Sequence, residues 1–80
     1  MQNNHYPRIR ELREEFHITQ KDLAEQMLMK RQQYARYEQG YNDIPSYVFI
    51  HLAQTFNVSV DYLLGLTDER TPYPRTKTDE

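Results

Sequence analysis

Hydrophobic residues recur at helical spacing along most of the chain. Pro7 suits the first turn of a helix, where no backbone N–H is needed and the φ angle of proline is already helical. Ile9, Leu12 and Phe16 then fall on one face of a 3.6-residue period. This pattern predicts a first helix of about ten residues that starts at Pro7.

Two short helices are predicted next, close together. Thr19 begins a capping-box-like Thr-Gln-Lys-Asp, which predicts a second helix that ends near Met27. Residues 31–38 form a third helix, and Gly40 ends it because glycine readily adopts the left-handed conformation found after helices. The connection between these two helices is only about three residues long, which is typical of a tight helix–turn–helix.

Two more helices complete the pattern. Pro45 and Ser46 open a fourth, and Asn57 is suited to the left-handed position that ends it. Ser59 caps a brief fifth helix that Gly65 closes. No strand-like alternation is present, so the chain is predicted to be an all-α, compact five-helix domain.

The two ends of the chain differ from this helical region. Residues 1–6 are expected to be a flexible N-terminus, and residues 7–66 to be the folded domain. Residues 67–80 contain two prolines, many charges and hardly an apolar side chain. Such a segment is expected to be a polar C-terminal tail that is disordered on its own.

Composition narrows the class of protein. Eighty residues allow one domain with a small core, which leaves little room for a deep substrate cavity. The absence of cysteine excludes disulfides, thiolate zinc sites and thiol nucleophiles, and a fold without disulfides is typical of the cytoplasm. The sequence has no apolar run of membrane-spanning length and no signal-peptide pattern, so neither membrane insertion nor export is expected.

Charge is unevenly distributed along the chain. The formal net charge of −2 argues by itself against a polyanionic partner. Residues 29–37, however, carry Lys30, Arg31 and Arg36 without any acidic residue. A cationic, amide-rich N-terminal half on the second helix of a tight pair is the arrangement that reads a DNA major groove.

A set of residues spread over positions 8–66 matches a known family. They are Arg8-Ile9, Leu12-Arg13, Ile18-Thr19-Gln20, Leu23-Ala24, Tyr34, Tyr37-Glu38, Gly40, Ile44-Pro45, Leu52-Ala53 and residues 57–65. With these residues the chain resembles the lambda repressor and Cro family of helix-turn-helix regulators, also called the Xre family. The resemblance implies a lambda-repressor-like fold with the helix-turn-helix at the second and third helices.

The resemblance also implies roles for individual residues. Base contacts are expected from the third helix and phosphate contacts from its surroundings, while one ion pair between the first and third helices is structural. The expected base contacts are Arg31, Gln32, Gln33 and Arg36, the expected phosphate contacts are Gln20, Lys30, Gln39, Tyr41 and Asn42, and the structural pair is Arg13 and Glu38.

Two positions depart from the family pattern. Leu28 stands in the turn where the family most often has glycine, so a left-handed backbone there would cost about 1 kcal/mol or the turn would differ locally. Lys30 stands where a Ser or Thr usually caps the recognition helix. Lysine cannot accept the free N–H groups of the first turn, and we expect a nearby phosphate to offset this loss.

Other residues have simpler interpretations than a ligand or catalytic site. Tyr34 and Tyr37 have the helical spacing of core residues. The three histidines, His5, His17 and His51, share no ligand spacing, so no metal is expected. The acidic pairs lack an accompanying Ser, His or Lys pocket and are typical of solvated helix faces, so we expect neither an enzyme nor a cofactor.

The function that the resemblance implies is a sequence-specific regulator of transcription. It is expected to bind double-stranded DNA as a homodimer on a palindromic operator, most simply as a repressor. An alternative is an antitoxin-type module that binds a toxin, with the C-terminal tail as a possible contact for that protein. Candidates for the dimer surface are the exposed part of the fifth helix and residues 71–75.

Overall fold

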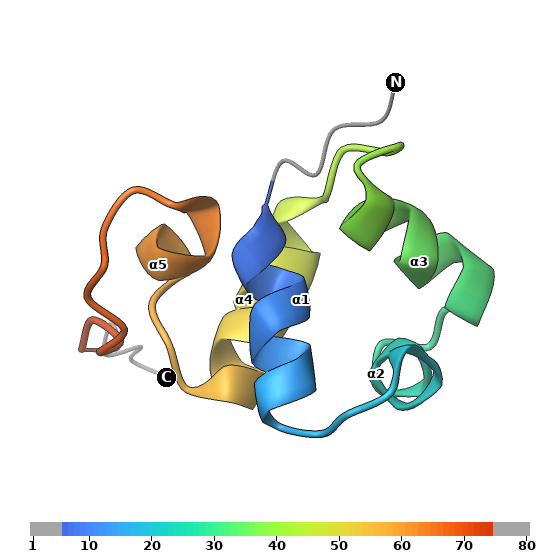
Figure 1. Cartoon of the computed structure of the whole chain (residues 1–80), viewed down its shortest axis with the longest axis horizontal. Coiled ribbons are helices and arrows are strands. Elements are labelled where there is room, and N and C mark those ends of the chain that lie inside the picture. Colours follow the sequence, from blue (N-terminus) through green and yellow to red (C-terminus); the bar gives the residue numbers. More distant parts are fainter. Residues whose placement is uncertain (1–5, 75–80) are drawn as a thin grey trace, which may run out of the picture.

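The computed structural model describes residues 6–74, and these contain five helices and no strand. In order along the chain they are α1 (Pro7–Glu15), α2 (Gln20–Gln26), α3 (Arg31–Gln39), α4 (Ser46–Phe56) and α5 (Val60–Leu64) (Figure 1). The all-α prediction is confirmed, and each helix lies within a residue or two of its expected position. None of these helices is long and apolar enough to span a membrane.

Two of the helices begin with the side-chain caps that their sequences predict. Thr19 Oγ1 accepts a hydrogen bond from the backbone N–H of Asp22 at 3.0 Å, and Ser59 Oγ accepts one from Tyr62 at 3.0 Å. Each bond satisfies one of the N–H groups that a helix start leaves without an intrahelical partner. Lys30, which precedes α3, makes no such bond, as its sequence implies.

Each of the five helices is followed by one residue in the left-handed conformation. Gly40 and Gly65 have φ angles of 84° and 83°, while Asn57, His17 and Leu28 have angles of 56°, 57° and 56°. The two glycines and Asn57 were predicted, whereas His17 was not. The left-handed turn lets the following N–H groups bond to the last carbonyls of the helix, so two residue types that disfavour this conformation are held in it.

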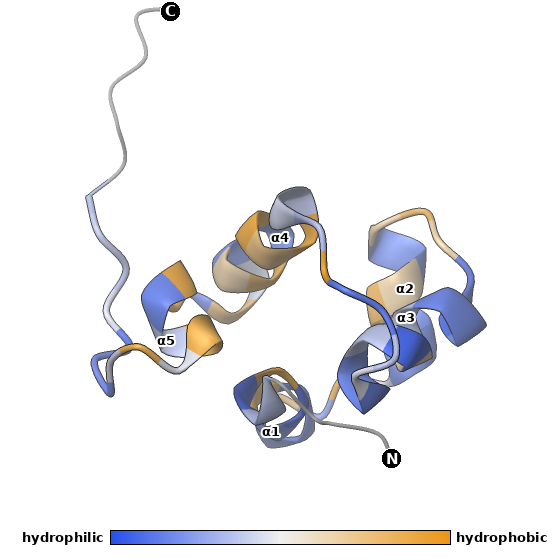
Figure 2. Ribbon diagram, turned by 90° about the horizontal axis from the view of Figure 1, so that it is seen from above, coloured by the Kyte–Doolittle hydropathy of each residue, from blue (hydrophilic) through white to orange (hydrophobic). Residues whose placement is uncertain are grey.

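The core lies where the five helices meet. Its fully buried members include Ile9, Leu12, Leu23, Leu52 and Leu63. Tyr34 is also fully buried and Tyr37 packs against the core, so the prediction of inward-facing tyrosines is confirmed. Figure 2 shows that α1 and α3 are mainly hydrophilic, whereas much of α4 is hydrophobic.

Residues 67–74, here called the strap, pack against the helices. The backbone N–H of the buried Ser59 donates to the carbonyl of Arg70 at 2.8 Å. The Arg70 guanidinium donates two 3.0 Å hydrogen bonds to the carboxylate of Glu15 at the end of α1. These contacts join the strap to both α1 and the start of α5.

Arg8 adds a second anchor for the strap. Its guanidinium donates to the carbonyls of Tyr62 and Thr67 and contacts the carboxylate of Asp68 at 2.6 Å. It also lies 4.1 Å above the centre of the Tyr62 ring, within the range of a cation–π contact.

The strap therefore differs from the disordered tail expected from its composition. The reason is that hydrogen bonds and ion pairs, not apolar side chains, hold it. Residues 1–5, which are most of the expected flexible N-terminus, and residues 75–80, which are the rest of the expected tail, lie outside the described residues.

Candidate nucleic-acid interface

The turn between α2 and α3 keeps the compact geometry of a helix-turn-helix although it lacks glycine. The N–H of Met29 bonds to the carbonyl of Ala24, and that of Leu28 to the carbonyl of Glu25, at 3.0 and 3.1 Å. This hydrogen-bond pair requires the left-handed backbone that Leu28 adopts. The Leu28 side chain is 95% exposed, so no burial of its apolar surface offsets the strain of its left-handed backbone.

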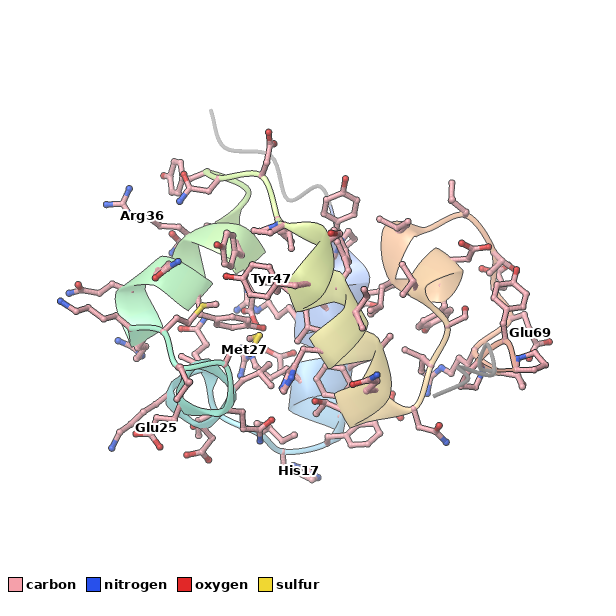
Figure 3. All side chains as sticks on the ribbon, turned by 180° about the vertical axis from the view of Figure 1, so that it is seen from behind. His17, Glu25, Met27, Arg36, Tyr47 and Glu69 are labelled. Carbon is pink, nitrogen blue, oxygen red and sulfur yellow. The ribbon has the colours of Figure 1, made fainter. Side chains whose placement is uncertain are left out.

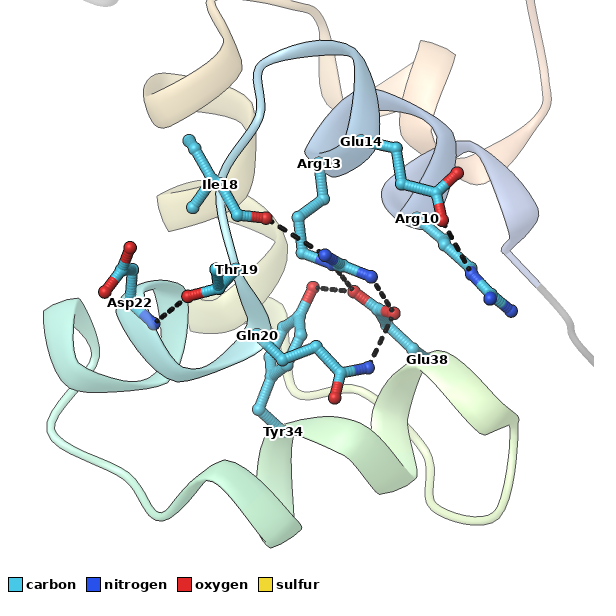
Figure 4. Close-up of polar contacts among 9 residues, drawn as sticks. All are labelled: Arg10, Arg13, Glu14, Ile18, Thr19, Gln20, Asp22, Tyr34 and Glu38. Atoms are coloured by element: carbon cyan, nitrogen blue, oxygen red, sulfur yellow. Dashed lines mark hydrogen bonds and ion pairs between the residues drawn. The ribbon is translucent and has the colours of Figure 1, made fainter.

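A polar network fixes α3 against α1 and α2 (Figure 4). Arg13 Nε lies 2.6 Å from Glu38 Oε2, which is the ion pair that the family resemblance implied. The buried Tyr34 hydroxyl donates to the same carboxylate, and Gln20 Nε2 donates to Glu38 Oε1 at 3.0 Å. Arg13 also donates to the carbonyl of Ile18 at 3.0 Å, so the network reaches the loop before α2.

The electrostatics of this network favour an ionised Glu38. Burial alone would raise the pKa of its carboxyl, but the hydrogen bonds from Arg13, Tyr34 and Gln20 lower that pKa below its usual value. Burial, followed by the proximity of Glu38, raises the pKa of Tyr34. The hydrogen bond to Glu38 likewise raises the pKa of Arg13. Glu38 is thus a buried anion whose neighbours all donate to it.

The outward face of α3 forms a shallow, open hollow, here called the α3 hollow. The residues that line it are Lys30, Gln32, Gln33, Ala35, Arg36, Gln39 and Asn42. None of them is acidic, and six are among the nine residues expected to contact bases or phosphates. Figure 3 shows Arg36 projecting away from the body at one end of the molecule.

The remaining three expected contacts lie elsewhere. Arg31 and Gln20 line a neighbouring hollow, here called the α2 hollow. Its other polar lining residues are Arg13, Thr19, Lys21, His17 and Glu14, whose carboxylate pairs with Arg10. Arg31 thus lines a different hollow from the other three residues expected to contact bases, although all four lie on α3. Tyr41 is 61% exposed in the loop after α3, beside Asn42 and outside the lining of either hollow.

Lys21 is a candidate that the sequence analysis missed. It lies in the first turn of α2 beside Gln20 and reaches Glu25 only at 4.0 Å across an exposed helix face. A surface pair of this length contributes little, so the ammonium group is available to an anion. Its position directly after Gln20 is the sequence signal that would have identified it.

Among the described residues, Lys30 gives the start of α3 no side-chain cap for its free N–H groups. Lys30 precedes the helix with an extended backbone, φ −74° and ψ 147°, and makes no side-chain cap. The first turn of α3 contains no acidic residue, so the positive end of the helix dipole is not neutralised there.

Apart from the carboxylate of Glu14 in the α2 hollow, the charged and amide side chains of the two hollows are cations and donors, which suit an anionic, hydrogen-bonding partner. The amides of Gln32 and Gln33 and the guanidinium of Arg36 can each donate two hydrogen bonds in one plane. Within residues 6–74, by contrast, no three His, Asp or Glu side chains gather closely enough to hold a metal ion.

Comparison with known proteins places this geometry in a family. A family profile described as helix-turn-helix matches residues 9–63. The chain is 38% identical over 65 residues to Uncharacterized HTH-type transcriptional regulator YobD of Bacillus subtilis (strain 168), across 81% of this chain and 58% of that protein. It is 36% identical over 58 residues to HTH-type transcriptional regulator ImmR of the same organism, across 72% and 46%.

The chain thus spans about half the length of these curated relatives. The profile match covers more than half of the chain and includes all of α2, the turn and α3. The chain therefore belongs to the helix-turn-helix family of lambda repressor and Cro type, the Xre family of DNA-binding transcriptional regulators.

Proposed function

We propose that this protein is a sequence-specific regulator that inserts α3 into the major groove of double-stranded DNA. The observation that carries the proposal is the α3 hollow, where amide and cationic donors line one exposed helix face without an acid. An α-helix with its side chains is about 10–12 Å across and the major groove is about 12 Å wide, so one helix fills it.

Three residues of the α3 hollow suit base recognition. Gln32 and Gln33 can pair with N6 and N7 of adenine, and Arg36 with O6 and N7 of guanine. Each bidentate pair is worth about 1–3 kcal/mol of discrimination against a wrong base. Arg31 belongs with them by family position, although it opens onto the α2 hollow, from which a guanidinium can reach either a base edge or a phosphate.

Phosphate contacts are proposed on both sides of this face. Gln20 Nε2 carries two hydrogens, and the one not donated to Glu38 can reach a phosphate beside Lys21. On the other side, Lys30, Gln39 and Asn42 lie along the α3 hollow, and Tyr41 follows in the adjoining loop. Such contacts fix the position of α3 without reading the sequence.

Binding as a homodimer to a palindromic operator completes the proposal. One α3 offers few contacts, and the net charge of −2 gives little bulk attraction to DNA. Two copies related by a two-fold axis would read half-sites about 34 Å apart and multiply the affinity. Repression follows most simply, because a dimer on a promoter blocks access to it.

Selection of bound sequences from a random DNA pool tests this function. We expect an enriched palindrome whose half-sites lie one helical turn apart. Gln32→Ala and Arg36→Ala should each cost about 1–3 kcal/mol on that sequence and relax one base position. Gln20→Ala should weaken all sequences alike. If no sequence is enriched, or if all three variants weaken every sequence equally, sequence-specific reading by α3 is refuted.

A further inference from the structure

The outer side of α4 exposes an apolar surface that the core does not use. Tyr47 and Ile50 are 59% and 51% exposed on this side of the helix, beside Gln54. A groove of about 320 Å³ continues the surface from Ile50 to Pro72 and Tyr73 of the strap. These side chains and the groove are here called the α4 face.

The strap builds one wall of the α4 face. Tyr73 is 68% exposed, yet its hydroxyl donates a 2.9 Å hydrogen bond to the carboxylate of Asp61 in α5. This bond holds the ring at the edge of the groove. Ile50 of α4 and Tyr73 of the strap thus line the same groove, and Tyr47 is exposed three residues before Ile50 on the same side of α4.

The charge of this surface suits a second copy of the same chain. When a face meets its own copy across a two-fold axis, each charged group near that axis meets a like charge. α4 contains no Asp, Glu, Lys or Arg along its eleven residues, whereas six of the nine residues of α1 are charged. The exposed side of α4 therefore brings no like charges together, and the one carboxylate that lines the groove, Asp61, already accepts the hydrogen bond from Tyr73.

The position of the α4 face relative to α3 also fits a dimer on DNA. In Figure 3, Tyr47 lies near the centre of the view, Arg36 projects at one end of the molecule and Glu69 of the strap lies at the other. Suppose that a two-fold axis runs along the α4 face, parallel to the long axis of the molecule. The rotation then leaves the α3 helices of both copies at the same end of the dimer. Both can then enter one side of a DNA duplex.

The thickness of the molecule gives a matching spacing. Figure 2 shows α4 at one edge and α1 at the opposite edge, with α3 between them along the shortest axis, which measures 24 Å. Half-sites about 34 Å apart require each α3 to lie about 17 Å from the two-fold axis. That distance falls within the thickness of one copy packed against the axis.

A dimer that pairs through the strap end would not place both α3 helices on one side of the DNA. The strap and α5 lie at the end of the long axis opposite α3, and that axis measures 40 Å (Figure 1). Two copies joined there would have α3 at the two outer ends of the dimer, facing away from each other. The two α3 helices could not then enter the major groove of one DNA duplex.

We propose that the α4 face is the homodimer interface of this protein, with a second copy of the chain as its occupant. This inference rests on the proposed function, because that function requires a dimer.

Sedimentation equilibrium of the full chain without DNA tests the interface. Ile50→Glu and, separately, Tyr47→Lys place a charge on the α4 face and should convert a dimer to a monomer. Leu66→Glu is the matched control, because Leu66 is 72% exposed and does not line the groove. Circular dichroism melting of each variant establishes whether it is folded. If one of the two charge variants fails to fold, the other still tests the interface.

Cross-linking gives a second readout, because the chain has no cysteine of its own. In Ile50→Cys and Tyr47→Cys, a short bismaleimide should join two copies, whereas Leu66→Cys should stay monomeric on a denaturing gel. Neither substitution touches a residue that is proposed to contact DNA.

The outcomes separate the interface from the function. A wild-type dimer that both charge variants dissociate, with half-site DNA binding kept and operator affinity lowered at least tenfold, supports the proposal. A wild-type dimer that both charge variants preserve refutes the α4 face and leaves the homodimer standing. A wild-type monomer that still binds a half-site refutes the homodimer itself while DNA binding stands.

Discussion

Replacing Glu38 by glutamine tests the network that holds α3. The Glu38 side chain is only 3% exposed and accepts hydrogen bonds from Arg13, Gln20 and Tyr34. Glutamine keeps the size of the side chain but removes the negative charge and presents an NH2 group to neighbours that are themselves donors. The guanidinium of Arg13, 13% exposed, is then left without its counter-ion.

The magnitude follows from the burial of the pair. Removing one partner of a buried ion pair costs about 3–5 kcal/mol. Arg13 keeps its hydrogen bond to Ile18 and borders the open α2 hollow, so the lower end applies. We expect a loss of about 3 kcal/mol in the free energy of unfolding, or about 12 °C or more in Tm for a domain of this size.

Urea denaturation followed by circular dichroism at pH 7 measures this loss. Glu14→Gln is the matched control, since it makes the same substitution in an exposed surface pair with Arg10 and should cost less than about 1 kcal/mol. A loss below about 1 kcal/mol for Glu38→Gln, equal to that of the control, would refute the reasoning.

The pH dependence gives an independent check. Because the folded pKa of Glu38 lies below its usual value of 4.5, its contribution is complete above that pH and is lost as the pH falls through the folded pKa. The stability difference between wild type and Glu38→Gln should therefore be largest at neutral pH and shrink in acid. A difference that stays constant down to the acid transition would contradict an ionised Glu38.

Three further substitutions test single features. Leu28→Gly should raise the free energy of unfolding by about 1 kcal/mol, because it relieves a left-handed leucine whose side chain is 95% exposed; an unchanged Tm would deny that strain. Lys30→Ser should raise stability by about 0.5–1 kcal/mol in melting experiments and lower DNA affinity with a shallower salt slope; unchanged affinity and slope would remove the proposed phosphate contact. Truncation after Leu66 should lower Tm by about 5 °C or more, because the buried Ser59 loses its strap partners, and an unaltered Tm would show that the strap contributes nothing.

Local signals were sufficient to predict the helices. The caps at Thr19 and Ser59, and the left-handed ends at Gly40, Asn57 and Gly65, depend on residue types that favour those conformations by themselves. Such preferences act over three or four residues, so they can be recognised in the sequence.

The left-handed backbone at His17 and Leu28 could not be predicted in this way. Neither residue type favours it. The short connections from α1 to α2 and from α2 to α3 demand it, and the hydrogen bonds of the following residues compensate for part of the strain.

The candidate site was predictable in its members and less so in its arrangement. Helical spacing and the family resemblance identified α3 and the residues that line the α3 hollow. Arg31, however, lines the α2 hollow with Gln20 and Lys21, because α3 packs against α2. The side to which a residue at the border of a helix face turns depends on the neighbouring helix, which the sequence pattern does not specify.

By itself, then, the sequence determined five helices, their order and a helix-turn-helix whose second helix carries amides and cations. Tertiary structure alone decided that Gln20 joins the Arg13–Glu38 pair, that the strap docks on α1 and α5, and that Tyr73 extends the α4 face. Helix formation depends on neighbours within one or two turns. Arg13 and Glu38 are 25 residues apart and Arg70 and Glu15 are 55 apart, and contacts over such distances exist only once the chain has folded.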